Sequence, residues 1–192
     1  MERALLAKLA AGAALVAPCL AGAQPATYRL DPSHSFVHFE VMHFGTATLR
    51  GRFGPLEGVA ELDRTARRGE VSLTIPTRIV STGLPVLDTR LRQADLLSSS
   101  EHPDAYFVAR QFVFDGDVLR EVRGEITLRG ISRPLALRSL GFSCGIHPMI
   151  QREWCGGDFE AELRRSDFGM SFGLPLVADR VRLQVQVEAI RD

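Results

Sequence analysis

Four residues between positions 144 and 155 have side chains that bind metals or form disulfides. They are Cys144, His147, Met149 and Cys155. Thiolate, imidazole and thioether groups together suit copper. A disulfide between Cys144 and Cys155 would consume both thiolates. Removal of Cys19 with the signal peptide predicted below leaves these two cysteines, and an even number in an exported chain favours such a bridge. The sequence therefore predicts a Cys144–Cys155 disulfide and no metal site, with copper binding as the alternative.

A serine in the same region lies in a G-x-S-x-G string. Residues 141–145 read Gly-Phe-Ser-Cys-Gly, which matches a nucleophile elbow. That elbow requires a sharp turn from a strand into a helix, and no helical pattern follows Gly145. We therefore expect a structural role for Ser143. No pair of acidic residues suggests acid–base catalysis, and no phosphate-binding glycine string occurs in the sequence, so we predict that the protein is not an enzyme.

Three histidines near the start of the chain form a further candidate metal site. His34, His38 and His43 fall in one stretch that alternates between apolar and polar residues. Side chains alternate across a strand, so positions 34 and 38 face one side and position 43 the other. The three imidazoles cannot converge on one ion unless the strand breaks, and we expect them to have structural roles.

Charge and composition exclude several classes of protein. The 23 basic and 23 acidic residues cancel, so the chain has no overall attraction to nucleic acid. Apolar residues make up 45% and charged residues 24% of the chain, which is typical of a globular protein. We therefore predict a folded domain that does not bind nucleic acid.

The N-terminus has the three parts of a secretory signal peptide. Arg3 and Lys8 precede a short apolar run at residues 9–16, and Ala21-Gly22-Ala23 supplies a cleavage site. The run is well short of the ~20 residues that span a bilayer. We predict a signal peptide at residues 1–23 and a mature domain at residues 24–192 in the periplasm. Lipidation of Cys19 is the alternative, but Pro18 is a poor context for it.

The body of the chain alternates with period two, which predicts antiparallel strands. Residues 112–118 suggest a hairpin around Asp115-Gly116, a pair that suits a type I′ turn. Residues 84–97 alone show a helical pattern. We predict an all-β fold of about eight strands and one short helix, closed into a barrel or packed as a sandwich. Two faces are expected to point inward, carrying Val37, Phe39, Val41 and His43 on the first and Val71, Leu73 and Ile75 on the second.

Six sequence blocks together resemble the YceI-like family and follow its order. They are residues 31–45, 51–53, 91–97, 102–107, 124–134 and 165–170. The resemblance implies a lipocalin-like antiparallel β-barrel, export to the periplasm, and a polyisoprenoid or similar lipid inside the barrel. The chain departs from the family at residues 142–156, where many members have a loop without cysteines.

The resemblance makes an exported lipid-binding protein our first functional hypothesis. It would enclose a polyisoprenoid or other long-chain lipid, or a quinone, as a carrier or store, with transient contact to a membrane or a membrane redox protein. The expected lining is Val37, Phe39, Val41, His43, Val71, Leu73, Ile75 and Phe107. His43 would meet a polar head group or bond a neighbour. The alternatives are a redox or copper accessory of a membrane electron-transfer chain and a filled barrel that binds other proteins.

Overall fold

The computed structural model describes residues 25–192, so the predicted signal peptide lies outside them. Within this range none of the helices is long and apolar enough to cross a membrane. The described elements are β1 (Ala26–Leu30), β2 (Phe36–His43), β3 (Ala47–Phe53), β4 (Glu57–Asp63), β5 (Arg68–Pro76), η1 (Thr77–Ile79), α1 (Pro85–Leu91), β6 (Asp104–Asp115), β7 (Val118–Leu128), β8 (Ile131–Ile146), β9 (Glu153–Arg164), η2 (Arg165–Phe168) and β10 (Val177–Arg191).

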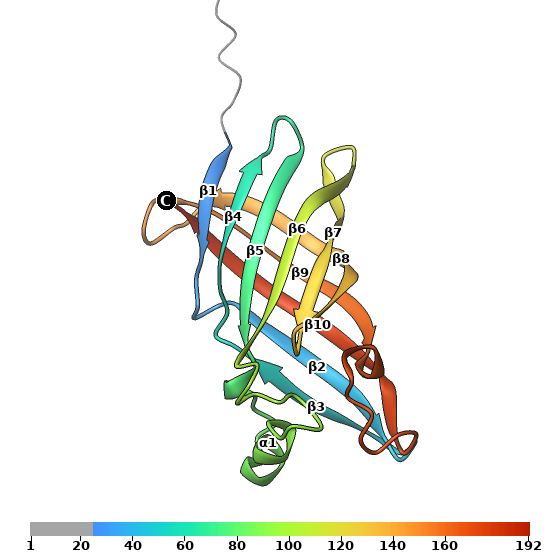
Figure 1. Ribbon diagram of the computed structural model, residues 1–192. Helices are drawn as coiled ribbons and strands as arrows, with labels where there is room; N and C mark the ends of the chain where they lie inside the picture. The colour runs from blue at the N-terminus through green and yellow to red at the C-terminus, as the bar shows by residue number, and fades with distance from the viewer. Residues whose placement is uncertain (1–24) are drawn as a thin grey trace, which may run out of the picture.

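Eight of the described strands close into an antiparallel barrel, as the sequence predicts (Figure 1). The strand order runs β1-β4-β5-β6-β7-β8-β9-β10, and pairing of β1 with β10 closes the ring. β10 pairs with β1 through residues 189–191 and with β2 through residues 177–186. The β2–β3 hairpin therefore extends the barrel wall at its lower end, where α1 also lies.

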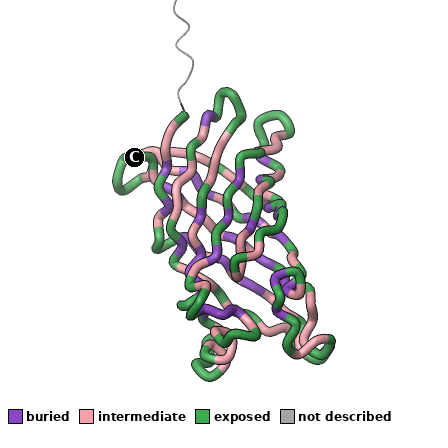
Figure 2. Tube along the Cα trace, in the orientation of Figure 1, coloured by how far each residue is buried: buried purple, intermediate pink, exposed green. Residues whose placement is uncertain are grey.

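The alternating sequence of each strand gives the barrel an apolar inside and a polar outside. On β10, Val181, Leu183 and Val185 are buried, whereas Arg182 is exposed. The same alternation of buried and exposed residues follows most strands in Figure 2. Because successive side chains of a strand point to opposite faces, one face of every strand enters the core.

A row of alternating charges crosses the outer wall from β8 to β3. Arg138 bonds Glu160, and Arg182 Nη2 lies 3.1 Å from the second oxygen of the Glu160 carboxylate. Arg182 also lies 3.6 Å from Glu40, which accepts a 2.8 Å hydrogen bond from Arg50 Nε. Bonds from Arg138 and then Arg182 lower the pKa of Glu160. Opposite charges on neighbouring strands favour this register, although exposed pairs contribute only ~0–1 kcal/mol each.

Two local predictions are confirmed in kind but not in detail. The helix expected at residues 84–97 is α1, Pro85–Leu91, and the chain then continues in turns because the Leu97 amide bonds back to the Leu91 carbonyl. The hairpin at Asp115-Gly116 connects β6 to β7. Of its two loop residues, Gly116 has φ +59° and Asp117 has no positive φ. That pattern belongs to a type II′ turn, in which glycine comes first, and the type I′ expectation is wrong.

The region expected as a loop, residues 142–156, is a β-hairpin. β8 and β9 pair up to Ile146 and Glu153, and only the turn at residues 147–152 is irregular. The sequence of this hairpin shows no clear apolar–polar alternation, because its glycines contribute no side chain to the pattern. A side chain at Gly157 would begin 2.3 Å from the Gly141 carbonyl oxygen, so the close strand approach requires glycine there.

Candidate functional site

The barrel encloses two apolar cavities. The upper cavity, toward β1 and β4, has a volume of about 70 Å³, and the lower cavity, toward α1, about 110 Å³. Side chains lining the upper cavity include Tyr28, Leu62, Val71, Leu73, Phe107, Phe112, Leu119, Leu137, Phe142, Cys155, Phe159 and Val185. Those lining the lower cavity include Phe39, Val41, Phe53, Leu91, Leu96, Met170, Val181 and Leu183. The inner faces of alternating strands line both cavities, and α1 with the turn that follows it completes the wall of the lower one.

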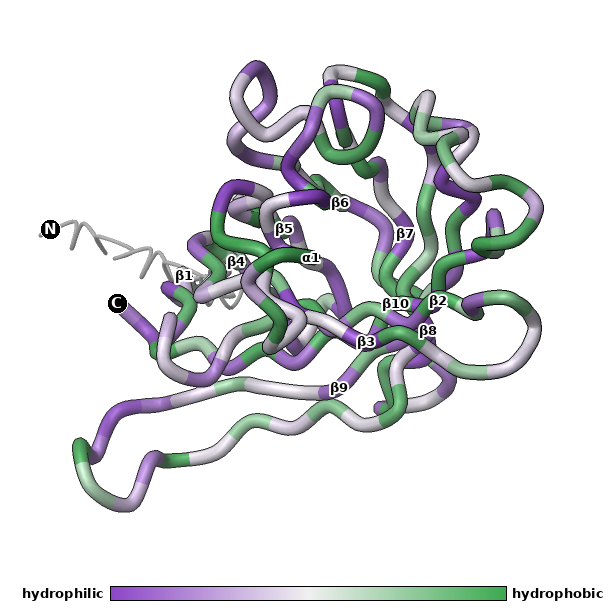
Figure 3. The backbone as a smooth tube through the Cα atoms, turned by 90° about the horizontal axis from the view of Figure 1, so that it is seen from below, coloured by the Kyte–Doolittle hydropathy of each residue, from purple (hydrophilic) through white to green (hydrophobic). Residues whose placement is uncertain are grey.

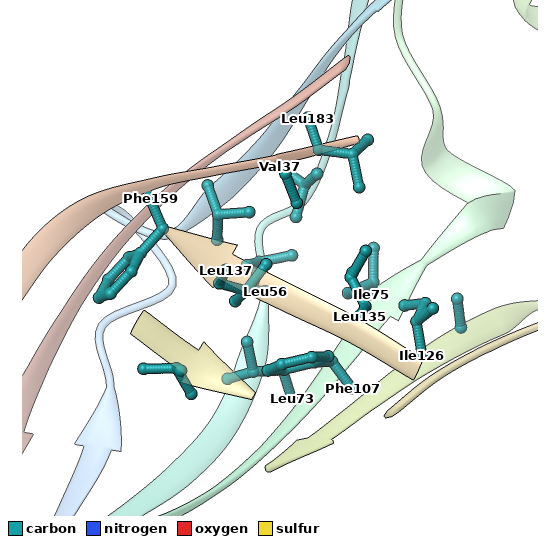
Figure 4. Packing of buried hydrophobic residues seen from close by; sticks show 14 of the residues in the cluster. Val37, Leu56, Leu73, Ile75, Phe107, Ile126, Leu135, Leu137, Phe159 and Leu183 are labelled. Carbon is teal, nitrogen blue, oxygen red and sulfur yellow. The ribbon is translucent and has the colours of Figure 1, made fainter. Parts of the chain in front are cut away.

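An aliphatic belt fills the interior between the cavities, and we define it as Val37, Leu56, Ile75 and Leu135 (Figure 4). None of the four lines either cavity, and each is at most 8% exposed. The residues two positions away on the same strands line the cavities. Leu73, next to Ile75 on the inner face, and Leu137, next to Leu135, line the upper cavity, whereas Phe39, next to Val37, lines the lower one. Packed side chains therefore divide what would otherwise be one continuous apolar channel.

The predicted lining residues divide between the cavities and the belt. Those in the upper cavity are Val71, Leu73 and Phe107; those in the lower cavity are Phe39 and Val41; those in the belt are Val37 and Ile75. His43, at the end of β2, lines neither cavity. Its ring lies against Phe44, with centroids 4.0 Å apart. The sequence alternation thus places seven of the eight predicted residues in the apolar interior, while the role of each toward a ligand stays a prediction.

Sequence reasoning missed several aromatic residues of the upper cavity. Tyr28 is 1% exposed, and burial raises the pKa of its phenol, an effect that the nearby Glu153 carboxylate strengthens. Phe112, Phe142 and Phe159 also line this cavity. Phe112 and Phe159 lie in alternating segments that could have revealed them. Phe142 gives no such signal, because a register shift between Ser139 and Gly141 breaks the alternation that begins at Leu135.

The lower cavity has one charged residue in its wall, Arg165, which is 5% exposed. Its guanidinium donates hydrogen bonds of 2.8–2.9 Å to the carbonyls of Met170, Phe172, Val177 and Ala178. Burial lowers the pKa of Arg165. These four bonds fasten the segment 170–178 to the end of β9, so Arg165 positions part of the cavity wall.

The predicted disulfide is confirmed. Cys144 and Cys155 are directly opposed on β8 and β9 and are covalently linked. Cys155 is 3% exposed and lines the upper cavity. The bridge removes both thiolates from the copper set considered for the alternative function, and the His147 Nδ1 atom accepts a 3.2 Å hydrogen bond from the Met149 amide.

The other candidate centres lie apart from the cavities. Ser143 occupies an extended strand opposite Gly156, not a strand-to-helix turn. The His34 ring hydrogen-bonds the Asp31 carboxylate, 2.6 Å from Nδ1 to Oδ2. Across residues 25–192, no group of three or more His, Cys, Asp or Glu side chains is arranged to hold a metal ion.

Comparisons with known proteins match this architecture. The family model described as the YceI-like domain matches residues 28–189. The UPF0312 protein of Pseudomonas aeruginosa (strain LESB58) is 33% identical over 199 aligned positions that cover 100% of both chains. The crystal structure of the Campylobacter jejuni YceI protein is 22% identical, with a TM-score of 0.67 over 79% of this chain and 90% of that one.

A further structural neighbour is described as a polyisoprenoid-binding domain from Saccharophagus degradans implicated in plant cell wall breakdown. It is 18% identical, with a TM-score of 0.60 over 87% of this chain and 99% of that chain. At this identity the likeness concerns the fold. The match of the family model to nearly all described residues, together with the 33% identical relative, establishes the family. The chain therefore belongs to the YceI-like domain family.

Proposed function

We propose that this barrel binds the apolar chain of a long-chain lipid, of polyisoprenoid or quinone type, and serves as a carrier or store rather than as an enzyme. The observation that carries the proposal is an interior lined by apolar side chains except at Arg165 in the lower wall, with cavities above and below an aliphatic belt. Membership of the YceI-like domain family and the structural likeness to a domain described as polyisoprenoid-binding support it.

The dimensions of the barrel suit an extended chain only if the belt moves. β5 has nine residues, about 30 Å at ~3.3 Å per residue, so an extended lipid chain can run along it. The cavities of about 70 and 110 Å³ are smaller than the ~300–1,000 Å³ of ordinary ligand sites. A long chain must therefore displace Leu56 and its neighbours and join the cavities into one tunnel.

The energetics favour exchange with a membrane over permanent capture. Each CH₂ group moved from water into the barrel contributes ~0.8 kcal/mol. Moved from a bilayer, the same group contributes almost nothing, because it is already out of water. A barrel of this kind thus gains and loses its lipid with a small net change in free energy, which suits a carrier or store.

The direct test is mass spectrometry of organic extracts from natively purified protein, combined with variants that fill each cavity. Val41→Trp fills the lower cavity and Leu73→Trp the upper one, at a cost of ~1–3 kcal/mol from overpacking. Both should retain less lipid per folded molecule. Val108→Trp, on the outer face of β6 where Val108 is 41% exposed, is the matched control and should retain as much as wild type. Equal retention in all four folded proteins would overturn the assignment.

Export is part of the proposal and has its own test. We propose that residues 1–23 direct the chain to the periplasm and are removed after Ala23. The support is the basic start, the apolar run and the small-residue site in the sequence. N-terminal sequencing of protein from the native host should begin at Gln24. Retained Met1 would contradict cleavage, and a lipid on Cys19 would show processing as a lipoprotein.

A further inference from the structure

The turn between β8 and β9 exposes a cluster of large apolar side chains. Ile146 is 62% exposed, Met149 85% and Ile150 49%, with Pro148 between them. Figure 3 shows this hairpin extending beyond the rest of the barrel, with hydrophobic positions at its tip. Single exposed apolar residues are ordinary on protein surfaces. A cluster of three exposed apolar side chains on one projecting turn indicates a surface that contacts an apolar partner.

Several backbone polar groups of the turn are bonded within the turn itself. The His147 amide donates to the Arg152 carbonyl at 2.8 Å, and the Gln151 amide to the His147 carbonyl at 2.9 Å. The Met149 amide donates to the His147 ring, and Gln151 Nε2 to the Pro148 carbonyl at 2.7 Å. Groups that are bonded internally need fewer bonds to water, so moving them to a less polar medium costs less.

The disulfide fixes the hairpin close to this turn. Cys144 pairs with Cys155, two residues before the last strand pair, Ile146 with Glu153. The tip therefore presents its side chains with little loss of conformational freedom on binding, since the backbone behind it is covalently cross-linked.

The charges around the turn have one predominant sign. Residues 146–152 contain Arg152 and no acidic residue. Arg64 and Arg191 share one carboxylate, that of Glu153, and Arg152 bonds the backbone carbonyl of Arg191. Arg29 pairs with Asp192 beside Arg191, so four arginines against two acidic side chains leave a net positive base behind an apolar tip. This combination suits a bilayer surface with anionic head groups.

Trp154 completes the pattern, because tryptophan favours the boundary between lipid and water. It follows Glu153 directly and pairs in register with Gly145, where a side chain would begin 3.6 Å from the indole nitrogen. The ring is half-buried on the outer face of the hairpin.

We propose that the β8–β9 tip docks onto an anionic phospholipid bilayer, with Ile146, Met149 and Ile150 inserted among the head groups. Cys155 and Phe142, on the two strands just behind this tip, line the upper cavity. Docking would therefore bring the wall of that cavity to the membrane. The purpose assigned to docking, exchange of the bound lipid, rests on the proposed function, whereas docking itself is measured separately.

Sedimentation with vesicles tests the proposal on the processed full-length chain. Vesicles of phosphatidylcholine with phosphatidylglycerol should bind the wild type more strongly than vesicles of phosphatidylcholine alone, and binding should fall as salt increases. Met149→Ser/Ile150→Ser should weaken binding roughly tenfold or more, because two side chains no longer enter the apolar region. Leu84→Ser/Val86→Ser is the matched control, since these residues are 53% and 72% exposed near α1 at the opposite end of the barrel.

Fluorescence gives a second readout, because Trp154 is the only tryptophan in the chain. Its emission should shift to shorter wavelength on anionic vesicles in the wild type and the control, and not in the tip variant. Wild-type binding unchanged by the tip substitutions, or loss of binding in the α1 control alone, overturns the proposal, as does a wild type that binds neither vesicle.

Lipid co-purification separates this proposal from the proposed function. A tip variant that loses vesicle binding but retains cargo supports docking and leaves the cavities intact. If the wild type carries no lipid yet docks through the tip, the proposed cargo is wrong and the docking surface remains.

Discussion

At the residue scale, Asp31 is the centre of a small hydrogen-bond cluster before β2. Its carboxylate accepts bonds from the Ser33 hydroxyl and amide and from His34 Nδ1. The Ser33 hydroxyl, followed by the His34 ring, lowers the pKa of Asp31 to about 2. Asp31 in turn raises the pKa of His34, first through the hydrogen bond and then through its charge.

This cluster predicts how His34 titrates. Because the folded pKa of His34 is raised, its contribution to stability is complete below about pH 6.5 and is lost as pH rises through the folded pKa. The contribution of Asp31 has the opposite dependence and is lost as pH falls from about 4 toward 2. Asp31→Asn should return the His34 pKa toward 6.5, measured by NMR titration. A His34 pKa that Asp31→Asn leaves unchanged would contradict the assignment.

Arg165 is the second residue whose contribution can be measured. Arg165→Met keeps an unbranched side chain but removes every donor, and it leaves the carbonyls of four residues without their partner. Unsatisfied buried groups cost ~1–3 kcal/mol each. We expect the free energy of unfolding in urea to fall by at least ~3 kcal/mol. Arg182→Met, on the outer wall, should change it by less than ~1 kcal/mol; equal effects of the two substitutions would refute the fastening role.

At the element scale, the β8–β9 hairpin depends on its cross-link. The bridged residues are 11 positions apart, and closing such a short loop contributes about 3 kcal/mol in the chain-entropy account. Cys144→Ala/Cys155→Ala should lower the free energy of unfolding by about this amount. Dithiothreitol should destabilise the wild type similarly and leave the double variant unchanged. Two free thiols in unfolded, unreduced wild type would contradict the bridge.

Strands with strict alternation could be predicted from the sequence, and β10 is the clearest of them. Its inward series from Val181 to Ala189 follows directly from the period of two. The hairpin extension could not be predicted, because Gly145, Gly156 and Gly157 contribute neither apolar nor polar side chains to a pattern. Their role depends on how closely neighbouring strands approach, which is a property of the assembled sheet.

The candidate site divides in the same way. Lining residues on regular strands, such as Leu73 and Phe39, could be predicted from their faces. Leu56 could not, because it lies between β3 and β4 outside any periodic segment, yet it is 0% exposed and belongs to the belt. Arg165 was visible as part of a family motif, but its contacts with residues 170–178 arise only from tertiary packing.

At the scale of the whole molecule, the barrel closes through a short seam. β1 pairs with β10 at three positions and with β4 at four, whereas β9 and β10 share eleven. Local opening requires least energy where the fewest backbone bonds must break. Hydrogen–deuterium exchange should therefore be faster in residues 26–30 than in residues 155–163. Slower exchange in β1 than in β9 would show that opening begins elsewhere.

Under the proposed function, the belt would also determine how the barrel behaves between one lipid-binding event and the next. A chain that enters must push Val37, Leu56, Ile75 and Leu135 out of their packed positions, and these side chains return when the chain leaves. The free energy gained when these side chains repack would thus supply part of the driving force for release. Because the middle of the barrel is filled by its own residues, the barrel without lipid has a packed interior. Release therefore need not produce a partly unfolded state that proteases cleave or that self-associates. In the proposed carrier, the same four side chains would slow loading and hasten release.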